Sequence, residues 1–329
     1  MTSLRFGRRG LAGLAAGVPT LAAALSRTAR GQPDWPTRPI TMVVPYPPGG
    51  TSDLSARPVA PRLGELLGQS VVIENRAGAG GSIGAEVVAR ARPDGYTLLA
   101  FPTAVLTISP HVMSLSYDPA TAFTPVSMST VAHGVVAAHP SLPFRDVAGL
   151  VAYARANPGG LRFGSAGNGT ITQLSGEMFA EAAGIRLEHV PYRGSAPSLT
   201  DLLAGRVQLL FDSVAIPAIR EGRLVAIATV AETRNPLLPE VPTLREAGLG
   251  QAEALPWFGV AAPAGLPAPI LDRLTAALGA VLAMPEVAAA MRPMGLTPSF
   301  EAGDAFADRI RREREMYGAV VRRIGTRPG

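Results

Sequence analysis

Two glycine-rich segments carry the residues of this sequence that are best suited to binding chemistry. Pro48-Gly49-Gly50-Thr51-Ser52 follows one apolar run, and residues 164–170 (GSAGNGT) follow another. Where such a segment leads into a helix, the first backbone amides have no partner within the helix and attract an anion. Glycine also lets a ligand approach the backbone closely. We predict that the two segments bind an anion together, the alternative being that both are tight turns that only cap their helices.

Other chemistries are disfavoured by residue type or by spacing. The chain has no cysteine and no lysine, which excludes disulfides, thiolate metal sites and Schiff bases. Its four histidines lack the close spacing of metal ligands, so no metal site is expected; they are His111, His133, His139 and His189.

The segment around Ser82 matches two catalytic motifs only in part. Residues 80–84 (GGSIG) fit the G-x-S-x-G motif of serine hydrolases, but five residues separate the preceding apolar run, which ends at Asn75, from Gly81. In that motif the serine directly follows its strand, so no catalytic residue is predicted. Ile83 stands where a dinucleotide motif needs its third glycine, and no cofactor is expected.

Charge is concentrated at the start of the chain. The 329 residues carry a formal charge of +5, with 30 basic and 25 acidic side chains. Five of the arginines and no acidic residue lie within residues 1–31, which leaves 25 of each charge in the remainder. A neutral body gives no support to nucleic-acid binding, which needs a clustered basic surface.

Residues 1–31 have the pattern of an export signal. A basic start precedes an apolar run from Leu11 to Leu25, and small residues precede an expected cleavage site between Gly31 and Gln32. The pair Arg8-Arg9 resembles a twin-arginine signal, although an ordinary Sec signal explains the segment equally well. The apolar run is too short to span a bilayer. We expect the mature protein to be periplasmic.

The remainder alternates short apolar runs with helical patterns, which is typical of α/β folds. Strands are expected at 39–46, 70–75 and 96–101, with helices at 52–67 and 82–91 between them. The same order returns in residues 161–230, and the chain ends in helices at 267–283, 285–295 and 303–325. Strand–helix–strand order predicts parallel sheets covered by helices.

Two extended segments, 131–140 and 255–265, are predicted to connect two domains of this kind. Domain 1 would then comprise residues 32–134 and 256–329, and domain 2 would be inserted as residues 135–255. Two adjacent connections make a hinge. The two glycine-rich segments, one in each domain, would face each other across the cleft.

Long stretches of the chain resemble the Bug-type periplasmic receptors that are associated with tripartite tricarboxylate transporters. The resemblance includes "VVPYPPGGTSDLSARP", "ENRAGAGGSIGAEVVA", "ANPGGLRFGSAGNGT", "HVPYRGSAPSLTDLLAGRVQLLFDS" and "WFGVAAPAGLP", and it covers essentially the whole chain after residue 31. It implies a two-domain, type II periplasmic-binding-protein fold (a Venus flytrap). It also implies a non-enzymatic receptor that acts as a monomer, without a metal or cofactor, and holds a carboxylate through backbone amides and bridging waters.

The resemblance also implies which residues form the site. The first loop is residues 46–53 and the second loop is residues 165–170. The predicted ligand contacts are Tyr46, Pro48, Gly50, Thr51, Ser52, Asp53, Thr103, Val105, Ser165, Ala166, Gly167, Gly169, Thr170, Tyr192 and Asp212. Asp53 and Asp212 could order a loop or accept from water on the ligand, although capping of a helix explains Asp53 at least as well.

Departures from the family pattern bear on the ligand. Val105, Leu106 and Gln173 stand where relatives often have threonine or histidine. The pocket wall is therefore expected to be less polar, and the ligand to be a small carboxylate with an apolar or aromatic body. Delivery to a membrane permease is the predicted role; a receptor for a membrane sensor kinase is the alternative, and a hydrolase using Ser82 is disfavoured.

Overall fold

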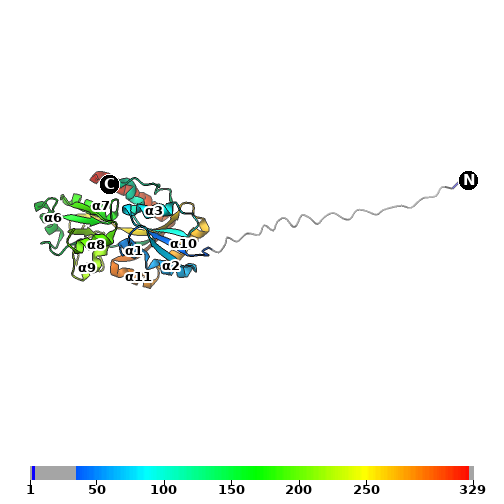
Figure 1. Cartoon of the computed structure of the whole chain (residues 1–329), viewed down its shortest axis with the longest axis horizontal. Coiled ribbons are helices and arrows are strands. Elements are labelled where there is room, and N and C mark those ends of the chain that lie inside the picture. The colour runs from blue at the N-terminus through cyan, green and yellow to red at the C-terminus, as the bar shows by residue number, and fades with distance from the viewer. Residues whose placement is uncertain (1, 4–34, 326–329) are drawn as a thin grey trace. The chain divides into compact units, whose positions relative to one another are not determined.

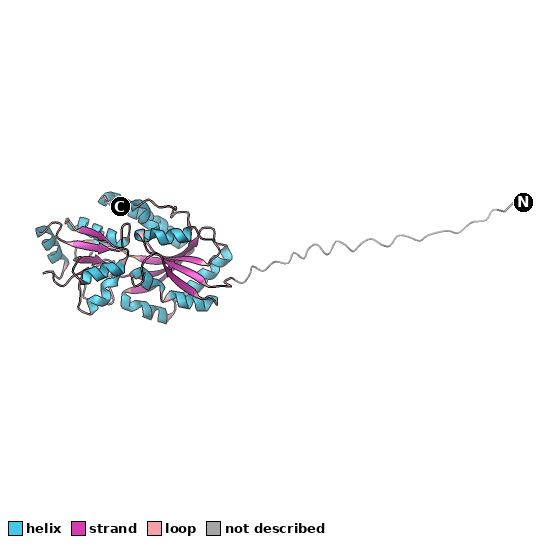
Figure 2. Cartoon of the chain, in the orientation of Figure 1, coloured by secondary structure: helices cyan, strands magenta, loops and turns pink. Residues whose placement is uncertain are grey.

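The computed structural model describes residues 2–3 and 35–325. The predicted export signal, residues 1–31, lies outside the described residues except for residues 2 and 3. The chain from Pro36 onward forms one compact unit that contains two β-sheets. Figure 2 shows both sheets flanked by helices. This mixed α/β architecture confirms the predicted fold class.

The first sheet has six strands in the order β11-β4-β10-β3-β1-β2. Its strands are β1 Ile40–Val44, β2 Val71–Asn75, β3 Thr97–Pro102, β4 Phe123–Ala132, β10 Trp257–Pro263 and β11 Leu296–Ala302. The strands β1, β2 and β3 pair in parallel, whereas β10 pairs antiparallel with both β3 and β4. The parallel pairing predicted for the first three strands is confirmed, but the sheet as a whole is mixed, because β10, which returns from the second sheet, and β11 run in the opposite direction to β1, β3 and β4. We call this sheet and its helices the first lobe.

The second sheet has five strands in the order β7-β6-β8-β5-β9 and, with its helices, forms the second lobe. Its strands are β5 Val135–Ala138, β6 Arg162–Ser165, β7 Glu188–Pro191, β8 Leu209–Phe211 and β9 Val225–Thr229. The strands β6, β7 and β8 are parallel, and β5 pairs antiparallel with β8 and β9. Each lobe thus repeats one design: a parallel group whose first strand leads into a glycine-rich loop.

Helices cover both sheets, with α1, α2, α3, α10 and α11 around the first and α6 to α9 around the second (Figure 1). Their bounds are α1 Thr51–Ala56, α2 Val59–Leu67, α3 Ser82–Ala89, α4 Ala104–Thr107, α5 Ser109–Val112, α6 Val147–Ala156, α7 Ile171–Ala183, α8 Ser195–Leu203, α9 Ile216–Arg220, α10 Ala268–Leu282, α11 Pro285–Met291 and α12 Gly303–Ile324. The helix expected over 52–67 is interrupted at Pro58, which lacks an amide hydrogen. The pattern did not reveal β4, β11, α4, α5 or α6.

Two chain segments connect the lobes. The first is the short step from β4 to β5 through His133 and Gly134, and the second is the long segment from β9 to β10. The two meet where the amide of Ala132 donates to the carbonyl of Pro256 over 2.8 Å. The domain limits drawn from the sequence, 32–134 with 256–329 and 135–255, remain a proposal. Two connections placed side by side are the arrangement of a hinge.

The C-terminal helix α12 contacts both lobes. Phe306 and Ile310 belong to the apolar core of the first lobe, together with Phe101. Two turns later, Tyr317 and Val321 pack into a cluster made mostly of second-lobe residues. None of the helices in the described residues is, on its own, long and apolar enough to cross a bilayer; α10 and α11 with the turn that follows pass that test only jointly, as a pair bent by 71°.

Candidate functional site

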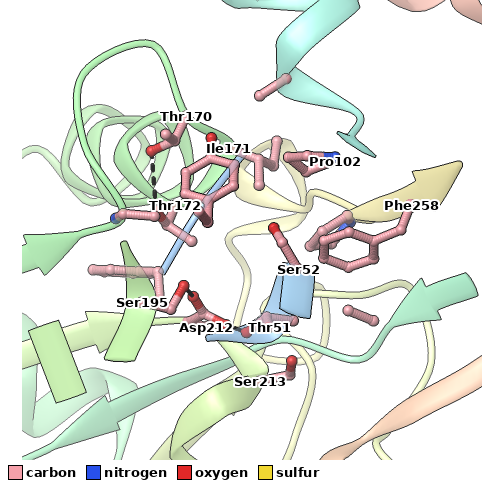
Figure 3. A pocket seen from close by; sticks show the side chains of 16 residues that line it. Thr51, Ser52, Pro102, Thr170, Ile171, Thr172, Ser195, Asp212, Ser213 and Phe258 are labelled. Carbon is pink, nitrogen blue, oxygen red and sulfur yellow. Dashed lines mark hydrogen bonds between the residues drawn. The ribbon is translucent and has the colours of Figure 1, made fainter. Parts of the chain in front are cut away.

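The two predicted loops lie against one cavity of about 30 Å³. Residues of both lobes and Pro256 of the second connecting segment line it (Figure 3). The lining residues are Tyr46, Thr51, Ser52, Pro102, Ala104, Ala132, Ala166, Thr170, Ile171, Thr172, Ser195, Phe211, Asp212, Ser213, Pro256 and Phe258. A volume of this size holds on the order of one or two water-sized groups. An acid can therefore enter it only when the loops separate.

The first loop is held from behind by Asp53, so its helix start stays open. No side chain caps the N-terminus of α1, so its first amides are left without an intrahelical or side-chain partner. Asp53 is fully buried and accepts from the Gly49 amide (2.9 Å), Arg57 Nε (2.6 Å) and Asn75 Nδ2 (3.0 Å). Burial alone would raise the pKa of Asp53, but these hydrogen bonds together lower it. Asp53 orders the loop and does not line the cavity.

The second loop uses its own side chains to satisfy its amides. The amides of Ala166, Gly167 and Gly169 donate to Thr172 Oγ1 (2.8 Å), Ser165 Oγ (3.1 Å) and Gln173 Oε1 (2.7 Å) respectively. Thr170 caps α7 by accepting from the Gln173 amide. Fewer amides than the sequence suggested are therefore free for a ligand. What faces the cavity here is Ala166 and the start of α7, namely Thr170, Ile171 and Thr172.

Asp212 joins the two lobes inside the cavity. It is 5% exposed, and its Oδ1 accepts from Thr51 Oγ1 of the first lobe over 2.6 Å. Oδ1 also accepts from the Val214 amide, and Oδ2 accepts from Ser195 Oγ. Burial raises the pKa of Asp212, because these hydrogen bonds only partly offset the lost hydration of its carboxylate. Figure 3 shows Asp212 between Ser195 and Thr51, the residues whose hydroxyls it accepts.

A seam of close backbone contacts between the lobes, at Gly80 and Asn168, borders a second, outer groove of about 940 Å³. Gly80 of the first lobe has φ +61°, and a Cβ there would lie 2.3 Å from the carbonyl oxygen of Asn168 in the second lobe. Tyr46 holds this turn by donating to the Gly80 carbonyl over 2.6 Å. The groove is lined by residues that include Pro48, Ser82, Gly167, Tyr192 and Arg193.

The predicted site residues therefore fall into three sets. Tyr46, Thr51, Ser52, Ala166, Thr170 and Asp212 line the cavity. Pro48, Gly167 and Tyr192 line the outer groove, where Tyr192 donates to Asp201 over 2.8 Å. The remaining predicted residues line neither and stand behind the loops or within the seam; they are Gly50, Asp53, Thr103, Val105, Ser165 and Gly169.

Two of the residues behind the loops have other partners. Thr103 Oγ1 donates to Glu313 of α12 over 3.1 Å, and Val105 packs with Leu106 in the first-lobe core. The apolar character of Val105 and Leu106 thus serves the core, and it says nothing about the pocket wall. Gln173 likewise supports Gly169 and does not line the cavity.

Sequence reasoning missed the cavity residues Ser195 and Ser213 and the apolar wall of Pro102, Ile171 and Phe258. A signal was present for Ser195, because Gly194-Ser195 begins α8 after β7 and is a third strand-to-helix turn of the expected kind. Phe258 lies in β10, just after the second connecting segment, and its place at the site depends on how the lobes meet. No local pattern carries that information.

The enzymatic motif is not assembled. Ser82 Oγ donates to the carbonyl of Ala79 over 2.9 Å and lies at the exposed edge of the outer groove. Within the described residues, no three His, Asp or Glu side chains are grouped so that they could hold a metal ion. His189 is instead packed on Phe163, with its Nε2 2.6 Å from Ser165 Oγ.

Comparisons with known proteins identify the family of this chain. The model of the tripartite tricarboxylate transporter family receptor matches residues 55–326. The UPF0065 protein in the tcbD-tcbE intergenic region of Pseudomonas sp. strain P51 is 39% identical over 317 residues, which are 95% of this chain and 93% of that one. Protein BugT of Bordetella pertussis is 36% identical over 297 residues, 89% of this chain and 91% of its own.

Solved structures of similar proteins have a similar fold. Periplasmic binding protein BugD superposes with a TM-score of 0.85 at 32% identity, covering 90% of this chain and 100% of its own. Rpa4515 of R. palustris with adipate has a TM-score of 0.86 at 36% identity, with coverages of 90% and 100%. MatC of Rhodopseudomonas palustris with bound malate has a TM-score of 0.81 at 31% identity, with coverages of 87% and 100%.

Proposed function

Because the chain belongs to the family of tripartite tricarboxylate transporter receptors, we propose that it binds a small organic carboxylate in the periplasm and presents it to the membrane subunits of such a transporter. The observation that carries this proposal is the cavity to which both loops contribute, with Thr51 of one lobe hydrogen-bonded to Asp212 of the other. Two similar structures hold organic acids, adipate and malate.

The cavity size implies how the ligand is captured. The acid enters when the lobes separate at the two connecting segments, and closure then surrounds it. A ligand favours closure only if it binds the closed form better than the open one. Contacts from both loops to one carboxylate supply that difference, because in the open form only one loop reaches it.

Asp212 restricts where the carboxylate lies. A second anion in contact with the buried Asp212 would be repelled, or would raise the pKa of Asp212 further. The protons of Thr51 Oγ1 and Ser195 Oγ are already directed at Asp212. We therefore place the carboxylate at the starts of α1 and α7, beside Ser52 and Thr170, and away from Asp212.

The apolar wall favours a ligand with an apolar body. Pro102, Ala104, Ile171, Phe211 and Phe258 face the same cavity as the polar groups. A hydrogen bond to a charged group contributes about 1.5–3 kcal/mol, and micromolar affinity corresponds to about −8 kcal/mol. Four or five contacts to the carboxylate, with the body packed on the wall, are sufficient.

Calorimetric titration tests the proposal. The mature protein is titrated with aliphatic and aromatic monocarboxylates, and with citrate and aspartate as polar controls, while mass spectrometry identifies any acid that co-purifies with the protein. We expect micromolar binding of acids with apolar bodies and weaker binding of the controls. Tight binding of citrate or aspartate without any response to the others would contradict the proposed ligand class, and no response to any carboxylate would contradict the receptor function.

A further inference from the structure

The hydroxyl of Ser213 is an unused hydrogen-bonding group at the candidate site. Ser213 directly follows Asp212, is 2% exposed and lines the cavity. Its Oγ has no hydrogen-bond partner among residues 35–325. Burial of a hydroxyl without a partner is costly, so nearly all buried hydroxyls in proteins have one. Ser213 therefore needs a partner that the rest of the described chain does not supply.

Asp212 cannot be that partner, although it is adjacent. A carboxylate accepts about four hydrogen bonds, and Asp212 already accepts from Thr51 Oγ1, Ser195 Oγ and the amides of Ser213 and Val214. In the view of Figure 3 Ser213 lies on the other side of the Asp212–Thr51 pair from Thr170. Ser213 thus marks the end of the cavity that is remote from the start of α7.

Ser213 differs in its position from the other buried hydroxyls that have no hydrogen-bond partner. In the described chain these are Tyr117, Ser127, Ser198 and Thr229. None of them lines the cavity or the outer groove. Ser198, for example, lies over Gly164, where an added Cβ would be 2.2 Å from its Oγ. Only the unpartnered hydroxyl of Ser213 is placed where a ligand can reach it.

We propose that Ser213 Oγ donates a hydrogen bond to a second, uncharged oxygen of the bound acid, and so selects hydroxy or oxo acids over their unsubstituted analogues. This inference rests on the proposed function. A neutral oxygen is preferred to a second carboxylate because Asp212 adjoins Ser213. The acid then spans the cavity, with its carboxylate at the starts of α1 and α7, its body on the apolar wall and its second oxygen at Ser213.

Matched ligand pairs test the selection. The wild type, Ser213→Ala and Ser198→Ala are titrated with benzoate and para-hydroxybenzoate, and with hexanoate and butanoate and their terminally hydroxylated forms. For at least one pair, the wild type and Ser198→Ala should bind the hydroxylated acid about tenfold more tightly, the effect of one hydrogen bond. Ser213→Ala should bind both members of that pair equally. If the preference survives Ser213→Ala, or if no variant prefers an oxygenated member, the inference fails although acid binding still supports the receptor function.

Thermal unfolding of the same proteins without any acid tests the inference independently of ligand binding. Because the hydroxyl has no partner in the folded protein, Ser213→Ala should unfold at the wild-type temperature or above it, as should Ser198→Ala. A fall of several degrees for Ser213→Ala alone would show that the hydroxyl serves the fold, and would overturn the inference. If the wild type binds no acid at all, the proposed function fails and this inference fails with it.

Discussion

The first and second loops have the same sequence pattern and opposite hydrogen-bonding arrangements. Both follow the first strand of a parallel group and lead through glycine into a helix. The first loop is braced from behind by Asp53, and no side chain caps the helix that it begins. The second loop is braced from within, since three of its amides donate to Thr172, Ser165 and Gln173. The comparison shows that a glycine-rich loop after a strand predicts where the chain turns at a site. It does not predict which backbone amides of that loop remain free to bind a ligand.

The largest expected effect comes from the seam where the two lobes touch. In Gly80→Ala the added Cβ would lie 2.3 Å from the Asn168 carbonyl, so the lobes could not approach as they do. Affinity for the acid should fall at least about a hundredfold, because contacts from one of the two loops, about 3 kcal/mol or more, are lost. Titration calorimetry measures the loss.

Gly68→Ala is the matched control for the seam. Gly68 lies in the same lobe at φ +78°, with no atom within 4 Å of an added Cβ. Both variants should lose a similar 1–2 kcal/mol or so of unfolding free energy from the left-handed backbone, but only Gly80→Ala should lose binding. Equal affinities in the two variants would show that lobe contact is not needed to hold the ligand.

A smaller effect, on the free energy of unfolding, should distinguish the second loop, whose own side chains hold its amides, from the first loop. Gln173→Leu leaves the buried amide of Gly169 without its acceptor, which should lower the free energy of unfolding by about 2 kcal/mol. Ser52→Ala in the first loop should cost less than about 0.5 kcal/mol, because the Ser52 hydroxyl makes no hydrogen bond within the described chain. Urea unfolding of both variants checks the difference, and a reversed order would contradict the account of the two loops.

A pH dependence is expected from His189, which lies behind the second loop. Burial lowers the pKa of His189 from 6.5 to about 4. Above pH 6.5 the residue is neutral in both states, whereas between pH 6.5 and 4 the unfolded chain binds a proton that the folded chain does not. Its contribution to stability therefore decreases as pH falls through this window.

The His189→Asn variant isolates this contribution. The buried Asp212 has a raised pKa and acts with the opposite sign, gaining stability as pH falls, so the two variants must be compared at each pH. Urea unfolding between pH 7 and 4 should show the wild type losing more stability than His189→Asn. Parallel curves would mean that His189 is not held neutral against Ser165.

The local sequence pattern was sufficient to predict the elements that carry the site. The spacing of apolar residues and glycines gave β1, β6, α7 and both loops to within a few residues, because each is determined by neighbours in sequence. One part of the second loop's bracing was also readable: Thr170 and Gln173 have the spacing of a capping box, and Thr170 accepts from the Gln173 amide as in that motif. The Gln173 side chain, however, accepts from Gly169, one residue before the cap.

Features that depend on how the lobes meet were not accessible from the sequence. The antiparallel entry of β10, the cavity of about 30 Å³ and the place of Ser213 in it arise from contacts between residues far apart in the chain. Val105 shows a related limit: the adjacent Ala104 lines the cavity, but the side chain of Val105 packs in the first-lobe core.

A crystal structure of the mature protein with a bound acid tests the central claim most directly. We predict one acid enclosed between the lobes, with its carboxylate in contact with both the start of α1 at Thr51 and Ser52 and the start of α7 at Thr170. An acid bound to one loop only, or held in the outer groove beside Tyr192 and Arg193 while the cavity stays closed, would contradict it.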